Sequence, residues 1–176
     1  SYEPEEALVE GYCRSKELLW QRLDESMIDR LEMLNSSPLY FSPLESFRGF
    51  FDSIVKRIQS LPVYVINPDI KPETLLLPLE GNAVILHWGR WSIEPIGAGW
   101  PVKESELKSL AKNVKQAALI RPSLSSISLM DIRLAALIFN FESLYHREHF
   151  IKALELLPEI LRCVDTPLKE KTIESV

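Results

Sequence analysis

The segment that most constrains the fold runs from residue 122 to 141 and reads PSLSSISLMDIRLAALIFNF. Ser128 is followed three residues later by Asp131. This is the spacing of a capping box, in which the serine oxygen accepts from a free helix amide and the acid accepts from the serine amide. Behind this start only Arg133 and Asn140 are polar in the middle of the segment. A helix that is apolar on nearly all sides is buried on most sides, so the segment predicts a buried central helix.

Length and composition are those of one globular domain. The chain has 176 residues, 46% of them hydrophobic and 26% charged, which favours a sizeable core over disorder. Its net charge of −5 argues against attraction to nucleic acid or to an anionic membrane surface. No apolar run approaches the roughly 20 residues that span a bilayer. We therefore expect a single helical domain over residues 1–176, with no direct nucleic-acid contact and no membrane.

The start of the chain and its cysteines bear on its location. The chain begins at Ser1, with no initiator methionine and no signal-peptide core, so we expect a fragment of a longer intracellular protein of the nucleus or cytoplasm. Cys13 and Cys163 lie near opposite ends. We expect two reduced, half-buried thiols; the alternative is one disulfide that ties the termini, which would need an oxidising compartment.

Two long helices are predicted in the first third of the chain. Apolar residues recur at steps of three, four or seven over residues 4–34, and residues 35–38 end this helix. A second helix is predicted from a capping box at Ser42, with Pro43 in its first position, to Pro62. Its predicted apolar face consists of Phe47, Phe50, Phe51, Ile54, Val55, Ile58 and Leu61. Its predicted outward face consists of Asp52, Lys56, Arg57 and Gln59.

Prolines break up residues 62–80, where LPVYVI predicts a short extended piece. Residues 82–94 predict a β-hairpin, with one strand from Val84 to Trp88 and a turn at Gly89-Arg90. Helices are predicted over residues 101–120 and from Tyr145 to Val164, the second of them kinked or split at Pro158. The predicted fold is mainly α: a bundle of five or six helices around a buried central helix, with one small β-hairpin.

No spacing in the chain predicts catalysis or metal binding. His146 and His149 lie one helical turn apart, but zinc needs further ligands and neither cysteine is near in sequence; we expect a solvent-facing polar helix start. The cap explains Ser128, and no GxSxG elbow is present. Gly97 and Gly99 lack the lysine or third glycine of a phosphate loop. We therefore expect no enzyme, no metal and no cofactor.

Trp88, Trp91 and Trp100 lie within thirteen residues, with Arg90 among them. Two interpretations stay open. In one, the aromatic face of the hairpin packs on the core. In the other it forms a binding surface or a pocket wall, because tryptophan and arginine are common interface anchors. Two indoles beside a two-residue turn must point to different faces, or one must be exposed. Trp88, Arg90, Trp91 and Trp100 are therefore our candidate binding residues.

Residues 120–143, IRPSLSSISLMDIRLAALIFNFES, resemble the segment from helix 7 to helix 8 of nuclear receptor ligand-binding domains, particularly the divergent nematode-type receptors. Phe47 to Pro62 is similar to the end of helix 3 in that family. The predicted hairpin at residues 82–94 stands where the family has its β-turn, and residues 146–162 stand where it has helix 9. The order of these pieces along the chain matches the order in the family.

The chain also departs from that family. Gln59 stands where the family has a helix 3 lysine, prolines between residues 68 and 78 interrupt the region of helices 4 and 5, and nothing follows Val176 to form the activation helix. Coactivator docking is therefore not part of what the resemblance implies here. It implies a domain that binds a hydrophobic small molecule beside the hairpin, with Arg90 as the nearest cation for a ligand carboxylate.

Together these patterns favour a non-enzymatic protein–protein interaction domain of a larger intracellular protein, with a regulatory role and a protein partner. The alternative is a nuclear-receptor-like ligand-binding domain that binds a hydrophobic small molecule and regulates transcription. A homodimer stays open as well. An interaction domain predicts an exposed apolar patch that includes Trp88, Trp91 or the helix of Phe47. A ligand-binding domain predicts a closed apolar cavity beside the hairpin.

Overall fold

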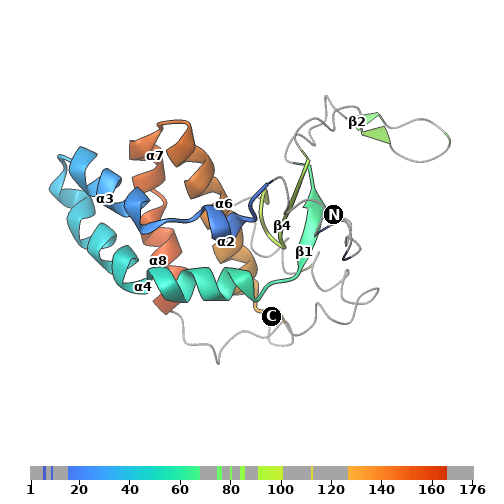
Figure 1. Cartoon of the computed structure of the whole chain (residues 1–176), viewed down its shortest axis with the longest axis horizontal. Coiled ribbons are helices and arrows are strands. Elements are labelled where there is room, and N and C mark those ends of the chain that lie inside the picture. The colour runs from blue at the N-terminus through green and yellow to red at the C-terminus, as the bar shows by residue number, and fades with distance from the viewer. Residues whose placement is uncertain are drawn as a thin grey trace.

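A computed structural model describes part of the chain. The described residues are 16–67, 91–100 and 127–165, together with Glu6, Val9, 75–76, Glu80, 84–85 and Lys112. Helices gather at one end of the molecule and strands at the other (Figure 1). The protein is mainly α with small antiparallel strand pairs, as the sequence predicted. Within the described ranges, no helix is both long enough and apolar enough to cross a membrane.

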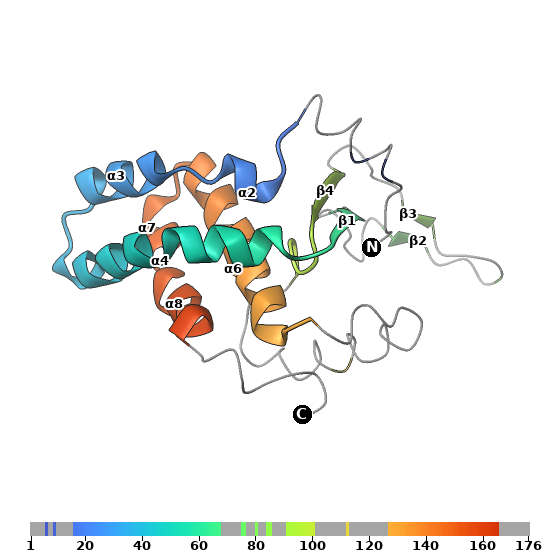
Figure 2. The same cartoon turned by 60° about the horizontal axis from the view of Figure 1, so that its bottom comes forward.

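The described elements follow one another in this order. They are α2 (Leu19–Arg22), α3 (Glu25–Leu34), the 3₁₀ helix η1 (Pro38–Tyr40), α4 (Phe41–Gln59), β1 (Val63–Ile66), β2 (Leu75–Leu76), β3 (Val84–Ile85), β4 (Ser92–Pro95), α6 (Leu129–His146), α7 (Phe150–Leu154) and α8 (Leu157–Asp165). α3 and α4 lie side by side and are joined at the end of the molecule away from the strands (Figure 2).

The predicted central helix is confirmed as α6. The amide of Met130 donates to Oγ of Ser128 at 3.2 Å, so the predicted serine cap is present. The other predicted hydrogen bond of the capping box, from the amide of Ser128 to the side chain of Asp131, is wrong. Oδ1 of Asp131 accepts instead from Nε of Arg57 at 2.6 Å. Buried residues lie all around the helix, and among them are the polar side chains of Arg133 and Glu142.

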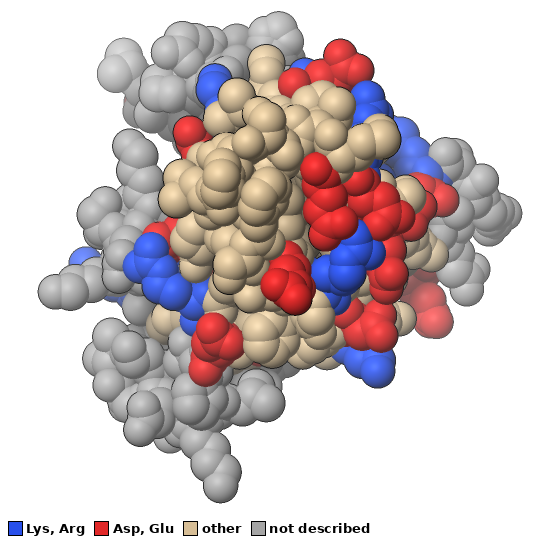
Figure 3. All heavy atoms as spheres, turned by 90° about the vertical axis from the view of Figure 1, so that its left-hand side faces the viewer, with Lys and Arg blue, Asp and Glu red and all other residues tan. Residues whose placement is uncertain are grey.

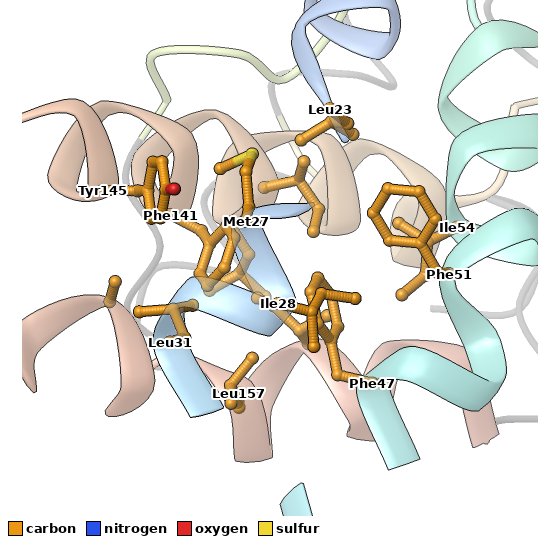
Figure 4. Close-up of a cluster of buried hydrophobic side chains, with 14 of the residues drawn as sticks. Leu23, Met27, Ile28, Leu31, Phe47, Phe51, Ile54, Phe141, Tyr145 and Leu157 are labelled. Carbon is orange, nitrogen blue, oxygen red and sulfur yellow. The ribbon is translucent and has the colours of Figure 1, made fainter. Parts of the chain in front are cut away.

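The main core lies where α3, α4 and α8 meet α6 (Figure 4). The rings of Phe47 and Phe141 have their centroids 5.2 Å apart, and Ile28, Ile54 and Leu137 are buried around them. An aromatic pair of this kind contributes about 0.5–1.5 kcal/mol beyond the area that it buries. The apolar face predicted for α4 is therefore confirmed as the side that packs on the core.

The first helix differs from the prediction of one continuous helix over residues 4–34. Glu6 and Val9 are helical, and the remainder of residues 4–15 lies outside the described residues. The chain then breaks between α2 and α3, where Leu23 is extended and the side chain of Asp24 accepts from the amide of Ser26. This cap starts a new helix, which the apolar periodicity alone could not indicate. The predicted end is confirmed, because Asn35 caps α3.

The start of α4 also differs from the prediction. Ser42 was expected to be its cap, but α4 begins at Phe41 and continues directly from η1. Pro38 occupies the first position of η1 and starts the turn four residues earlier. Arg57 was expected to face away, yet only 15% of its side chain is exposed, because it pairs with Asp131 on α6.

The predicted hairpin is wrong in its pairing. Both of its segments contain a strand, but β3 pairs with β2, and β4 pairs with β1, with Val63 opposite Pro95 and Ile66 opposite Ser92. The LPVYVI segment predicted to be extended is confirmed as β1. Tyr64 of β1 and Ile93 of β4 are buried. The predicted turn at residues 89–90 lies outside the described residues.

The end of the chain differs from the predicted helix over 145–164. α6 continues to His146, and a turn in which Glu148 has a φ of 59° separates it from α7. The chain breaks again before α8, close to Pro158, so the predicted split is confirmed. The helix predicted over residues 101–120 lies outside the described residues apart from Lys112, which is helical.

We predict that Leu137→Ala lowers the free energy of unfolding by about 2–5 kcal/mol, because it leaves a cavity beside α6. Leu137 is 1% exposed. The matched control is Met33→Ala, at an 80% exposed position, which should change that free energy by less than about 0.5 kcal/mol. Urea unfolding followed by circular dichroism measures both. Equal effects of the two substitutions would contradict the packing of α6.

Candidate functional site

Large apolar side chains are exposed at one corner of the molecule. Of the six that are exposed in the described part of the chain, four lie within nine residues: Met33 (80% exposed), Leu34 (50%), Leu39 (72%) and Phe41 (54%). We call these four residues the α3–α4 corner, because α3 passes through η1 into α4 there (Figure 2). Scattered exposed apolar residues are ordinary, but a group of them is a candidate contact surface.

Hydrogen bonds and the core hold the corner in place. The side-chain amide of Asn35 donates to the carbonyl of Ser37 at 3.0 Å, and its Oδ1 accepts from the amide of Ser37 at 3.0 Å. On either side of the corner, Leu31 of α3 and Leu44 of α4 are fully buried in the main core. The exposed apolar residues therefore lie on a fixed turn whose two arms are packed.

Acidic residues lie along both helices that lead into the corner. Residues 24–52 contain six acids and two arginines, which gives this segment a net charge of −4. Arg48 pairs with Asp29 at 2.7 Å and with Glu32 at 2.9 Å. Arg30 lies 3.7 Å from Glu148 and 5.1 Å from the ring centroid of Phe150. Figure 3 faces this end of the molecule and shows an uncharged area with acidic residues gathered along its side.

The residues that the sequence singled out are placed only in part. Trp88 and Arg90 lie outside the described residues. Trp91 precedes β4 and is 36% exposed, whereas Trp100 is half-buried against a second core cluster that includes Tyr64 and Ile132. The prediction that these four residues form one binding site therefore stays a prediction. Phe41 belongs to the helix of Phe47, which was the other predicted place for an apolar patch.

The two histidines of the HxxH spacing and Cys163 lie in the described part of the chain. His146 and His149 are exposed, and Nε2 of His146 lies 3.4 Å from Oε1 of Glu142. No group of three or more His, Cys, Asp or Glu that could hold a metal ion occurs among the described residues. Cys163 is a free thiol that is fully buried, not half-buried as predicted, and burial raises its pKa to about 11. Cys13 lies outside the described residues.

A buried charge network joins the helices to the strands. Arg22 of α2 lies 3.1 Å from Glu94 of β4 and 2.9 Å from Glu142 of α6. Glu94 is 2% exposed, and its Oε2 makes no hydrogen bond in the described structure. Burial raises the pKa of Glu94 to about 7 and outweighs the attraction of Arg22, which is shared with Glu142. No local pattern marks Glu94 or Glu142 as partners of Arg22, so the sequence analysis missed this network.

Comparisons with protein-family models, with curated proteins and with solved structures find no match to this chain. The resemblance to nuclear receptor ligand-binding domains, and the hydrophobic ligand that it implies, therefore stay predictions from the sequence.

We predict that the stability of the protein falls as pH rises because of Glu94. Its pKa is about 7 in the folded state, above the ordinary glutamate value of 4.5, so the folded state binds this proton more tightly than the unfolded state does. The resulting stability is fully present below about pH 4.5 and is lost as pH rises to about 7, on the order of 3 kcal/mol in all. Glu94→Gln should remove this fall in the free energy of unfolding, measured by urea titrations across that range.

The matched control for this prediction is Asp24→Asn. The hydrogen bond from the amide of Ser26 lowers the pKa of Asp24 below its ordinary value of 3.8. The stability that Asp24 contributes is therefore fully present above pH 3.8 and is lost only as pH falls toward the lowered pKa. The control should therefore keep the wild-type fall in stability between pH 4.5 and 7. Parallel stability curves for wild type and Glu94→Gln would contradict the assignment to Glu94.

Proposed function

We propose that this chain is a non-enzymatic protein–protein interaction domain of a larger intracellular protein, and that it binds its partner through the α3–α4 corner. The observation that carries the proposal is the exposure of Met33, Leu34, Leu39 and Phe41 within nine residues. The proposal does not depend on the tryptophan segment, two of whose four candidate residues lie outside the described residues.

The energetics of the corner favour a contact surface. Burying apolar area stabilises by about 25 cal/mol per Å², so a partner that covers these four side chains gains free energy that the isolated domain lacks. This gain in free energy is reduced by the cost of ordering any loop or side chain that becomes fixed on binding. The Asn35–Ser37 hydrogen bonds and the buried side chains of Leu31 and Leu44 already fix the turn. The backbone that carries the exposed apolar side chains is therefore held in place before a partner binds.

The test is comparative affinity capture. The full-length parent protein is captured from cells as wild type and as the double variant Met33→Ser/Leu39→Ser. Both positions are strongly exposed, so folding should be unchanged; circular dichroism and urea unfolding check this. The expected result is a set of proteins that wild type retains and the double variant loses, because the apolar anchors of the interface have been removed.

Trp91→Ala serves as the matched control. Trp91 is another exposed large apolar residue, and it directly precedes β4, at the end of the molecule away from the corner (Figure 1). This variant should retain the same set of proteins as wild type. If a folded double variant retains every protein that wild type retains, the corner is not the interface and the proposal is wrong.

A further inference from the structure

We infer that the segment docking on the α3–α4 corner is short, amphipathic and basic, with apolar side chains on one face and lysines or arginines beside them. This inference rests on the proposed function and adds the chemistry of the partner. It follows from the acidic residues on the two helices that form the corner and from the short stretch of chain that carries its apolar side chains.

The acidity of the chain is concentrated at this end of the sequence. Residues 24–52 have a net charge of −4 and the whole chain has −5, so the remaining residues together have a net charge of only −1. Both arginines of the segment are already engaged, Arg48 with Asp29 and Glu32, and Arg30 with Glu148. Neither arginine pairs with Glu45, which is exposed on α4 and accessible to a cation of a partner.

Single acids are well placed to contact such a partner. Glu32 directly precedes Met33, and 43% of its side chain is exposed beside the ion pair with Arg48. Glu45 is exposed and lies four residues after Phe41 on α4, which puts the two on the same face of the helix. A lysine or arginine that flanks an apolar anchor on the corner would reach these carboxylates. Its contribution would be greatest to the association rate and to specificity.

A second copy of this chain fits the surface less well. A two-fold dimer through the corner would place the same patch on both subunits. Each copy would then bring its net charge of −4 from residues 24–52 against that of the other. Like charges that face one another across an interface disfavour the wrong partner. An anionic membrane surface and a nucleic acid are disfavoured by the same charges.

The apolar surface suits a short segment. The exposed apolar side chains of the corner come from one stretch of nine residues, whereas an interface between folded domains usually involves about 20–30 residues on each side. Short segments dock instead through a few apolar anchors at regular spacing. The corner offers four apolar side chains for such anchors, and its acids would contact the polar positions between them.

The experiment measures binding of fluorescent peptides to the full chain by anisotropy. Three peptides of about 14 residues share the same length. The first has leucines on one helical face and lysines and arginines on the other. The second replaces those cations with glutamates. The third scrambles the first, so that its charge is kept and its apolar face is lost.

We expect the first peptide to bind at least about tenfold more tightly than the other two, and to weaken as salt rises from about 0.05 M to about 0.3 M. Met33→Ser/Leu39→Ser should abolish binding. Glu45→Lys should weaken binding several-fold more than the control Glu17→Lys. The two substitutions change the net charge equally, but Glu17 is exposed before α2, beyond the end of α3 that is far from the corner.

Other results would overturn the inference. These are tighter binding of the glutamate peptide, equal binding of the scrambled peptide, insensitivity to salt, or equal effects of Glu45→Lys and Glu17→Lys. The proposed function is judged separately by the capture experiment. If the double variant loses its captured proteins while the glutamate peptide binds best, the domain docks at the corner and only the basic character of its partner is wrong.

Discussion

Burial of α6 on nearly every side is the constraint on which the rest of the structure depends. Leu137 and Ile138 face the main core formed with α3, α4 and α8, whereas Ile132 and Ala135 face the cluster formed with β1 and the loop after β4. The loop after β4 approaches the backbone of α6 very closely. A Cβ on Gly97, whose φ is 99°, would lie 2.1 Å from the carbonyl oxygen of Ile132, so only glycine allows the loop to cover α6 there. Helices and strands thus share one buried helix as their common support.

Polar side chains on α6 form ion pairs with three of the helices that cover it. Asp131 pairs with Arg57 of α4, Arg133 with Glu159 of α8, and Glu142 with Arg22 of α2, so each ion pair joins α6 to a different helix. Ion pairs of this kind add little net stability once desolvation is counted. Losing one partner, however, leaves a buried charge that is costly, and this disfavours other arrangements of the helices around α6.

The sequence predicted what local patterns determine and missed what distant contacts decide. α6 was predictable because its apolar surface surrounds the helix and Ser128 marks its start. The predicted start of α4 was wrong because a helix can begin at Pro38 as well as at Ser42, and the local sequence does not decide between the two. The pairing of β1 with β4 joins segments almost thirty residues apart, which a search for local hairpins does not consider. Leu34 fitted the apolar periodicity of the first helix yet is exposed, because periodicity does not reveal where a packed face ends.

The position of the corner explains how a surface of this kind can coexist with a stable core. Leu31 and Leu44 anchor its two arms in the core, whereas Met33, Leu34, Leu39 and Phe41 are exposed and do not belong to the main core. Substitutions of these four exposed residues should therefore have little effect on folding, whereas substitutions of buried residues in α6 should destabilise the fold. The same segment holds most of the excess negative charge of the chain. Its electrostatic field would steer a basic segment toward the fixed apolar side chains before any of them is covered.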